Sequence, residues 1–80
     1  MYILIHVVSQ TLANMAKKLL SREGIYTTVK KSPPSVSKTG CGYCLKVNSR
    51  ELSRALTVLR DNNIKYLGLY EVDGESVRRV

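Results

Sequence analysis

The chain has 80 residues, of which 13 are Lys or Arg and 6 are Asp or Glu, with two cysteines and a formal net charge of +7. A chain this short buries only about 60% of the surface that its unfolded form exposes, which excludes a second core and the substrate domain of a large enzyme. Its longest apolar run, residues 2–8, is far shorter than the roughly 20 residues of a membrane-spanning helix, and the N-terminus has no signal-peptide layout. We therefore expect one small cytoplasmic domain with its cysteines reduced and with no membrane partner.

Residues 2–8 are β-branched and aliphatic without clean alternation, a pattern that is typical of a central strand covered on both faces. Ser9 is placed to cap a helix over residues 10–23, in which apolar side chains recur at helical spacing, and Gly24 is placed to end it. Strand composition returns at residues 25–31. This part of the chain is therefore predicted to form a β-α-β unit.

The rest of the chain repeats that order after a Pro-containing loop. A strand is predicted at residues 43–47, and a second helix follows with Asn48 or Ser49 as its cap. A fourth strand is predicted at residues 64–72. Two β-α-β units in tandem predict an α+β fold, the ferredoxin-like β-α-β-β-α-β sandwich.

That fold has an antiparallel sheet in the strand order 4-1-3-2, with two helices on one face. We expect residues 1–74 to form this single domain and residues 75–80 to be a short polar tail. The topology brings three features to one edge of the sheet. They are the end of the first strand, the start of the first helix, and the loop between the second and third strands.

Cys41 lies in that loop, between Gly40 and Gly42. The predicted topology places it near the first turn of the helix capped by Ser9, where backbone N–H groups stabilise a thiolate and make it a better nucleophile. Lys38 adds a positive charge, and the two glycines leave the sulfur open to a bulky partner. The alternative is that Cys41 is a small buried hydrophobe at a turn.

Two further side chains near this edge have chemistry of their own. Cys44 completes a C-x-x-C with Cys41, but side chains three apart on a strand point to opposite faces, so we expect packing rather than an internal disulfide. His6, within the first strand, is either a hydrogen-bonded histidine of the sheet or a proton-transfer partner of the thiol. One His and two Cys do not supply a zinc site, and we expect no metal and no cofactor.

Aromatic side chains share the strand parity that points away from the helices. With Leu4, they are Tyr2, Tyr26, Tyr66 and Tyr70. An uncovered aromatic face indicates either a homodimer packed sheet to sheet or stacking of single-stranded nucleic acid. The third-strand signature of RNA-binding domains is broken, because Cys41 and Lys46 stand where it has stacking aromatics. We therefore expect nucleic-acid binding to be weak and non-specific.

Several short motifs follow one another in a fixed order: Ala16-Lys17-Lys18-Leu19-Leu20, Gly24-Ile25, Pro33-Pro34, Cys41-Gly42-Tyr43-Cys44-Leu45 and Ile64-Lys65-Tyr66-Leu67-Gly68-Leu69-Tyr70. In this order and spacing, over about residues 2–72, the chain resembles the small bacterial proteins of the selenium/sulfur (Se/S) carrier protein-like family. The resemblance implies a non-enzymatic carrier whose Cys41 holds a persulfide or selenium in a relay between donor and acceptor proteins. Cys44 stands where relatives commonly have a small residue, so it does not establish a dithiol mechanism.

Two other functions fit the same residues. The alternative is a non-catalytic binding module that uses its sheet face for a protein partner or single-stranded nucleic acid. A thiol enzyme such as a peroxidase or isomerase is disfavoured, because His6 is the one clear candidate for a second catalytic group.

Overall fold

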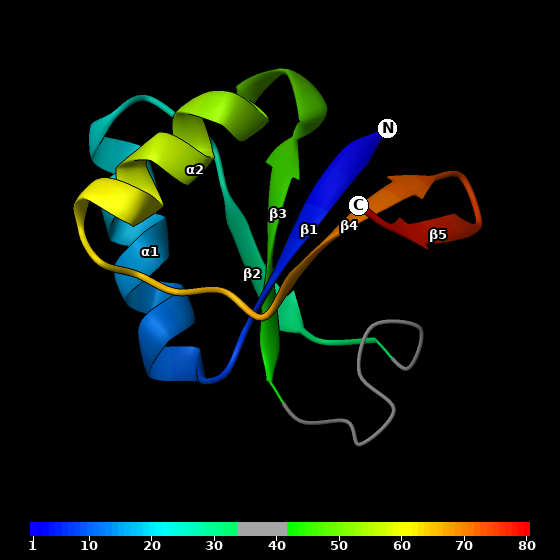
Figure 1. Cartoon of the computed structure of the whole chain (residues 1–80), viewed down its shortest axis with the longest axis horizontal. Coiled ribbons are helices and arrows are strands. Elements are labelled where there is room, and N and C mark those ends of the chain that lie inside the picture. The colour runs from blue at the N-terminus through cyan, green and yellow to red at the C-terminus, as the bar shows by residue number, and fades with distance from the viewer. Residues whose placement is uncertain (34–41) are drawn as a thin grey trace.

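The computed structural model describes residues 1–33 and 42–80. Lys38, Gly40 and Cys41, which the sequence analysis selects for the site, lie outside the described residues. Figure 1 shows the elements, which are β1 (Tyr2–Val7), α1 (Gln10–Arg22), β2 (Thr28–Lys31), β3 (Tyr43–Asn48), the 3-10 turn η1 (Ser49–Glu51), α2 (Leu52–Asp61), β4 (Gly68–Asp73) and β5 (Ser76–Arg79). No helix in residues 1–33 or 42–80 is long and apolar enough to cross a membrane.

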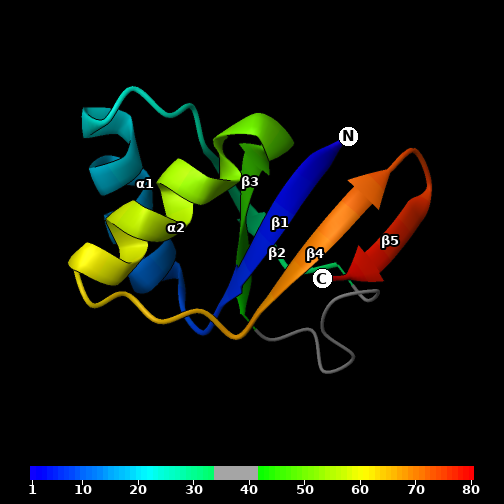
Figure 2. The same ribbon diagram turned by 45° about the horizontal axis from the view of Figure 1, so that its top comes forward.

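The strands form one antiparallel sheet in the order β2-β3-β1-β4-β5, so that β1 pairs with both β3 and β4. The expected four-stranded sheet of order 4-1-3-2 is therefore corrected to five strands: read from the other edge, the first four strands follow β4-β1-β3-β2, and β5 is added beyond β4. The sequence predicts a polar tail where β5 pairs with β4 as a hairpin at the edge of the sheet (Figure 2). Val77 lies opposite Val72, and Arg78 forms an ion pair with Glu71, so an apolar and a charged cross-strand pair hold β5 in place.

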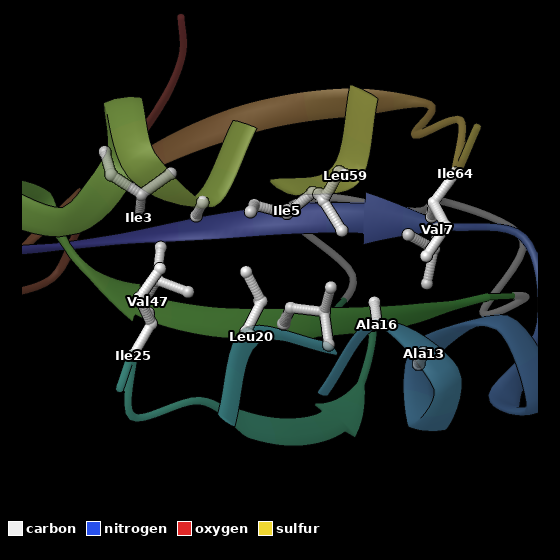
Figure 3. Packing of buried hydrophobic residues seen from close by; sticks show 12 residues of the cluster. Ile3, Ile5, Val7, Ala13, Ala16, Leu20, Ile25, Val47, Leu59 and Ile64 are labelled. Atoms are coloured by element: carbon white, nitrogen blue, oxygen red, sulfur yellow. The ribbon is translucent and has the colours of Figure 1, made fainter. Parts of the chain in front are cut away.

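The main core lies between one face of the sheet and the two helices (Figure 3). Alternate residues of β1, namely Ile3, Ile5 and Val7, point into it because successive strand side chains face opposite sides. Both helices contribute apolar side chains to this same cluster, so both cover the same face, as the sequence predicts. The other members are Ala13, Ala16, Leu20, Ile25, Leu45, Val47, Ala55, Leu59 and Ile64.

Helix α1 begins where the sequence predicts, because the Ser9 hydroxyl oxygen accepts a hydrogen bond from the Leu12 backbone N–H at 3.2 Å. The second predicted cap, Asn48, is also used, but it caps η1 rather than α2. Its side-chain oxygen accepts from the Arg50 N–H at 2.9 Å, and η1 leads directly into α2. The two caps fix the points at which β1 and β3 leave the sheet.

A smaller cluster lies on the opposite face of the sheet. Leu4, Cys44 and Val72 are its buried members. Half-buried Tyr2, Tyr70 and Val77 pack against them. This face therefore has a buried apolar centre of its own, and β5 contributes to it.

Candidate functional site

The described part of the predicted site lies where β1 ends. The Leu67 backbone N–H donates to the His6 carbonyl oxygen at 2.6 Å, which holds the start of β4 against this end of β1. On the other side, the Ser32 N–H donates to the Gly42 carbonyl oxygen at 3.2 Å, which holds the end of β2 against the start of β3. Ser9 caps α1 two residues after β1 ends. The end of β1, the start of α1 and the two described ends of the loop between β2 and β3 therefore share one edge of the sheet, as predicted, while residues 34–41 of that loop lie outside the described residues.

Gly42 occupies a position that no other residue fits without a shift. Its φ is +91°, in the left-handed region that residues with a Cβ rarely adopt. A Cβ built at Gly42 would lie 2.6 Å from His6 Nε2 and 2.8 Å from the Val7 carbonyl oxygen. The backbone beside Cys41 in the sequence thus approaches the His6 imidazole as closely as a glycine allows.

His6 is nine-tenths buried, and its Nε2 has no hydrogen-bond partner among the described residues. Its ring meets the Tyr70 ring edge-on, with 6.4 Å between the ring centroids. A buried nitrogen without a partner costs free energy, so such a group is expected to have a role or a ligand. A hydrogen-bonded histidine is one interpretation of His6 from the sequence, but Nε2 forms no hydrogen bond with any described residue. The proton-transfer role stays a prediction.

Cys44 faces His6 across the β1–β3 pair and is fully buried in the smaller cluster. Its Sγ lies 3.5 Å from the Ser32 hydroxyl oxygen. Burial raises the pKa of the Cys44 thiol above its ordinary value, while the hydrogen bond with Ser32 and the charge of Lys30 lower that pKa by less. Cys44 is therefore a packed, protonated thiol at neutral pH, in keeping with the packing role expected for it.

The structure brings together His6, Gly42 and Cys44, and Ser9 follows at the start of α1. In the residues that the structure describes, no three His, Cys, Asp or Glu side chains form a group that could hold a metal ion. Sequence reasoning missed Ser32, which binds Gly42 through its backbone and Cys44 through its hydroxyl. A serine before two prolines reads only as a loop residue, so no signal in the sequence pointed to it.

The uncovered tyrosine face of the sequence analysis needs correction. Strand β2 begins at Thr28 and β4 at Gly68, so Tyr26 and Tyr66 lie in the connections before them. The side chain of Tyr26 is 86% exposed, whereas Leu4, on the sheet face away from the helices, is buried. The sheet-to-sheet homodimer therefore stays a prediction, and its aromatic surface is reduced to Tyr2 and Tyr70.

Comparison with known proteins supports the resemblance seen in the sequence. A family model described as "Putative Se/S carrier protein-like" matches residues 2–71. The matched region runs from the start of β1 into β4, and it includes His6, Gly42 and Cys44. The chain has no match among curated proteins or among solved structures.

Proposed function

Since the chain belongs to this Se/S carrier protein-like family, we propose that it carries sulfur or selenium on the thiol of Cys41, from a donor protein to an acceptor protein. The chain is a carrier rather than an enzyme, because the load leaves on the acceptor. The observation that carries the proposal is the contrast between the two cysteines. Cys44 is fully buried and its pKa is raised, and the thiolate is the form that reacts. Cys41 is the other cysteine of the sequence.

The proposed loading step is a sulfur transfer between thiols. The Cys41 thiolate attacks the outer, sulfane sulfur of a donor persulfide, a sulfur–sulfur bond forms to Cys41, and the donor's sulfur–sulfur bond breaks. The donor leaves as a thiolate, and the proton of the persulfide stays with the transferred sulfur. No external oxidant or reductant is needed, because the transferred atom keeps its oxidation state.

Residues at the end of β1 support this role. Gly42 follows Cys41 in the sequence, and its lack of a side chain lets the start of β3 approach His6 closely. Among the described residues, His6 Nε2 is the unpartnered buried nitrogen next to Gly42, and an imidazole nitrogen can donate or accept a hydrogen bond there. We assign Ser9 a structural share, because its side chain fixes the start of α1.

Intact-mass spectrometry of protein purified without reductant tests the proposal. After incubation with a small-molecule persulfide donor, we expect an added mass of one sulfur atom, which dithiothreitol removes. The matched variants are Cys41→Ser, which should lose the adduct, and Cys44→Ser, which should keep it. An adduct that survives in Cys41→Ser, or one that is lost in Cys44→Ser alone, would contradict the assignment.

A further inference from the structure

The sheet carries a second group of side chains around the Tyr2 ring, which lies at the opposite end of β1 from Gly42; one of them, Lys30, starts in the row of Cys44 and His6 and extends toward that ring. We call it the Lys–Tyr patch and define it as Tyr2, Lys30 and Lys46. The register puts Lys46 opposite Leu4 and Lys30 opposite Cys44, so the patch lies on the sheet face away from the helices. Lys46 Nζ is 4.4 Å and Lys30 Nζ is 5.8 Å from the centroid of the Tyr2 ring. Two exposed ammonium groups thus converge on one half-buried ring.

These two charges lack acidic neighbours. Neither lysine forms an ion pair with any described residue, whereas Arg54, Arg60 and Arg78 each pair with a carboxylate elsewhere. Both ammonium groups lie over the same ring, so they are no more than about 10 Å apart, roughly one Debye length at 0.1 M salt. No carboxylate among residues 1–33 and 42–80 pairs with either lysine to offset their mutual repulsion, and an approaching anion would relieve it.

The distribution of acidic residues makes this face one-signed. Glu71 and Asp73 alternate along β4 with the residues that face the smaller cluster, so their side chains point to the other face of the sheet, away from the Lys–Tyr patch. Glu51 borders the groove beside Tyr2 and Lys46, but its carboxylate is bound to Arg54 at 2.8 Å. The remaining acidic residues stand at helix ends and in the β4–β5 turn, and they are Glu23, Asp61 and Glu75.

We propose that the Lys–Tyr patch docks an acidic segment of a partner protein. A groove of about 570 Å³ adjoins the patch, and its lining includes Tyr2, Tyr26 and Lys46. Carboxylates of the partner bind the two lysines, and the exposed Tyr26 ring borders the place where the rest of the segment lies. Electrostatic attraction of this kind speeds encounter and leaves the complex reversible.

An acidic protein fits this patch better than a single-stranded nucleic acid. Nucleic-acid platforms present free aromatic faces on which bases stack, but the Tyr2 ring lies beneath the lysine ammonium groups. The centre of the face, formed by Leu4, Cys44 and Val72, is aliphatic or thiol and is buried. The Lys–Tyr patch itself therefore offers charge without a free aromatic face, and Tyr26 is the exposed ring of the adjoining groove.

Docking at the patch is separate from the chemistry proposed for Cys41. Tyr2 and His6 are four residues apart on β1, which corresponds to about 13 Å along a strand, and the ammonium group of Lys30, whose backbone lies opposite Cys44, is directed toward the Tyr2 ring. The inference therefore does not rest on sulfur or selenium transfer. A negative docking result would leave the mass-spectrometric test of Cys41 untouched, and the reverse also holds.

Fluorescence anisotropy with a fluorescein-labelled deca-glutamate peptide tests the patch. The variant Lys30→Gln/Lys46→Gln should weaken binding about fivefold at low salt, because each exposed ion pair contributes modestly. The control Lys17→Gln/Lys18→Gln removes the same net charge from exposed positions on α1, and it should change the affinity less than twofold. Equal losses in the two variants would show that only the net charge matters and would overturn the proposal.

A second probe, the oligonucleotide dT10, separates the two classes of partner. Bound by charge alone, dT10 should keep its affinity within about twofold in Tyr2→Leu. A loss of fivefold or more in that variant would identify base stacking on Tyr2, and the face would then be a nucleic-acid platform instead of a docking site for an acidic protein.

Discussion

Replacing Gly42 with alanine tests the close approach between β3 and β1. The added methyl group would lie 2.6 Å from His6 Nε2 and 2.8 Å from the Val7 carbonyl oxygen. The backbone φ of +91° adds a second cost. A left-handed backbone costs a residue with a Cβ about 1–2 kcal/mol, and an overpacked contact costs about 1–3 kcal/mol. We therefore expect Gly42→Ala to lower the free energy of unfolding by about 2–5 kcal/mol.

Two other glycines supply matched controls. Gly24 has a φ of +76° and Gly74 a φ of +63°, but a Cβ at either position would meet nothing within 4 Å. Their alanine variants bear the backbone cost alone, about 1–2 kcal/mol. Urea unfolding followed by circular dichroism measures all three. If Gly42→Ala is no less stable than Gly24→Ala, the steric argument at the end of β1 is refuted.

A double-mutant cycle isolates the share of the imidazole. His6→Ala in the Gly42→Ala background removes one of the two close contacts and leaves the contact with the Val7 carbonyl oxygen. The double variant should therefore be more stable than the sum of the single effects predicts, by at least about 0.5 kcal/mol. Strict additivity would mean that His6 does not limit the residue at position 42.

Two further predictions concern the other face of the sheet. Burial raises the pKa of the Cys44 thiol above its ordinary 9.0, so the stabilisation that the protonated thiol contributes is fully present below that pH and is lost as pH rises through the folded-state pKa. In urea unfolding at about pH 7 to 10, the free energy of unfolding should fall by at most roughly 1.4 kcal/mol per pH unit. The variant Cys44→Ala should lack this fall. Equal pH dependence in the two proteins would contradict it. Val77→Asp should lower the free energy of unfolding by about 1–3 kcal/mol because it places a charge against the smaller cluster. Ser76→Asp, at an exposed position of the same strand, should have little effect. If thermal unfolding shows similar losses of stability in the two variants, β5 adds no packing.

The elements that sequence predicts well are those whose burial leaves a local pattern. β1 is buried on both faces, which leaves a continuous apolar run, and in α1 the apolar residues recur at helical spacing, so the sequence predicts both elements. The cap at Ser9 is also predictable from the sequence, because a serine directly before a helix accepts a hydrogen bond from a free backbone N–H of its first turn. These local signals also imply the pairing of both helices with one face of the sheet.

Strand β5 left no such pattern. Its sequence, Ser-Val-Arg-Arg, has one apolar residue among polar ones, and it reads as a tail. The interactions that fold it come from β4, where Val72 lies opposite Val77 and Glu71 pairs with Arg78. Non-local pairs of this kind do not depend on the composition of the segment itself, and they explain why the sequence predicts four strands where the sheet has five.

The site was predictable in its location and not in its contacts. The sequence indicated that β1, α1 and the start of β3 share an edge, but the approach of His6 to Gly42 depends on the register that sets Val7 opposite Tyr43. A shift of one residue would move His6 to the other face of the sheet. Register follows from packing across the whole sheet, so the residue that contacts Gly42 could not be identified from motif spacing.

The same register separates chemistry from docking. On the face away from the helices, β1 presents Tyr2, Leu4 and His6 in order, with a basic aromatic end, a buried middle and an imidazole end. Cys44 lies opposite His6 at the imidazole end, and burial raises the pKa of its thiol. In the two proposals made above, a partner docks around the Tyr2 ring at one end of β1, and the load is exchanged near Gly42 at the other end.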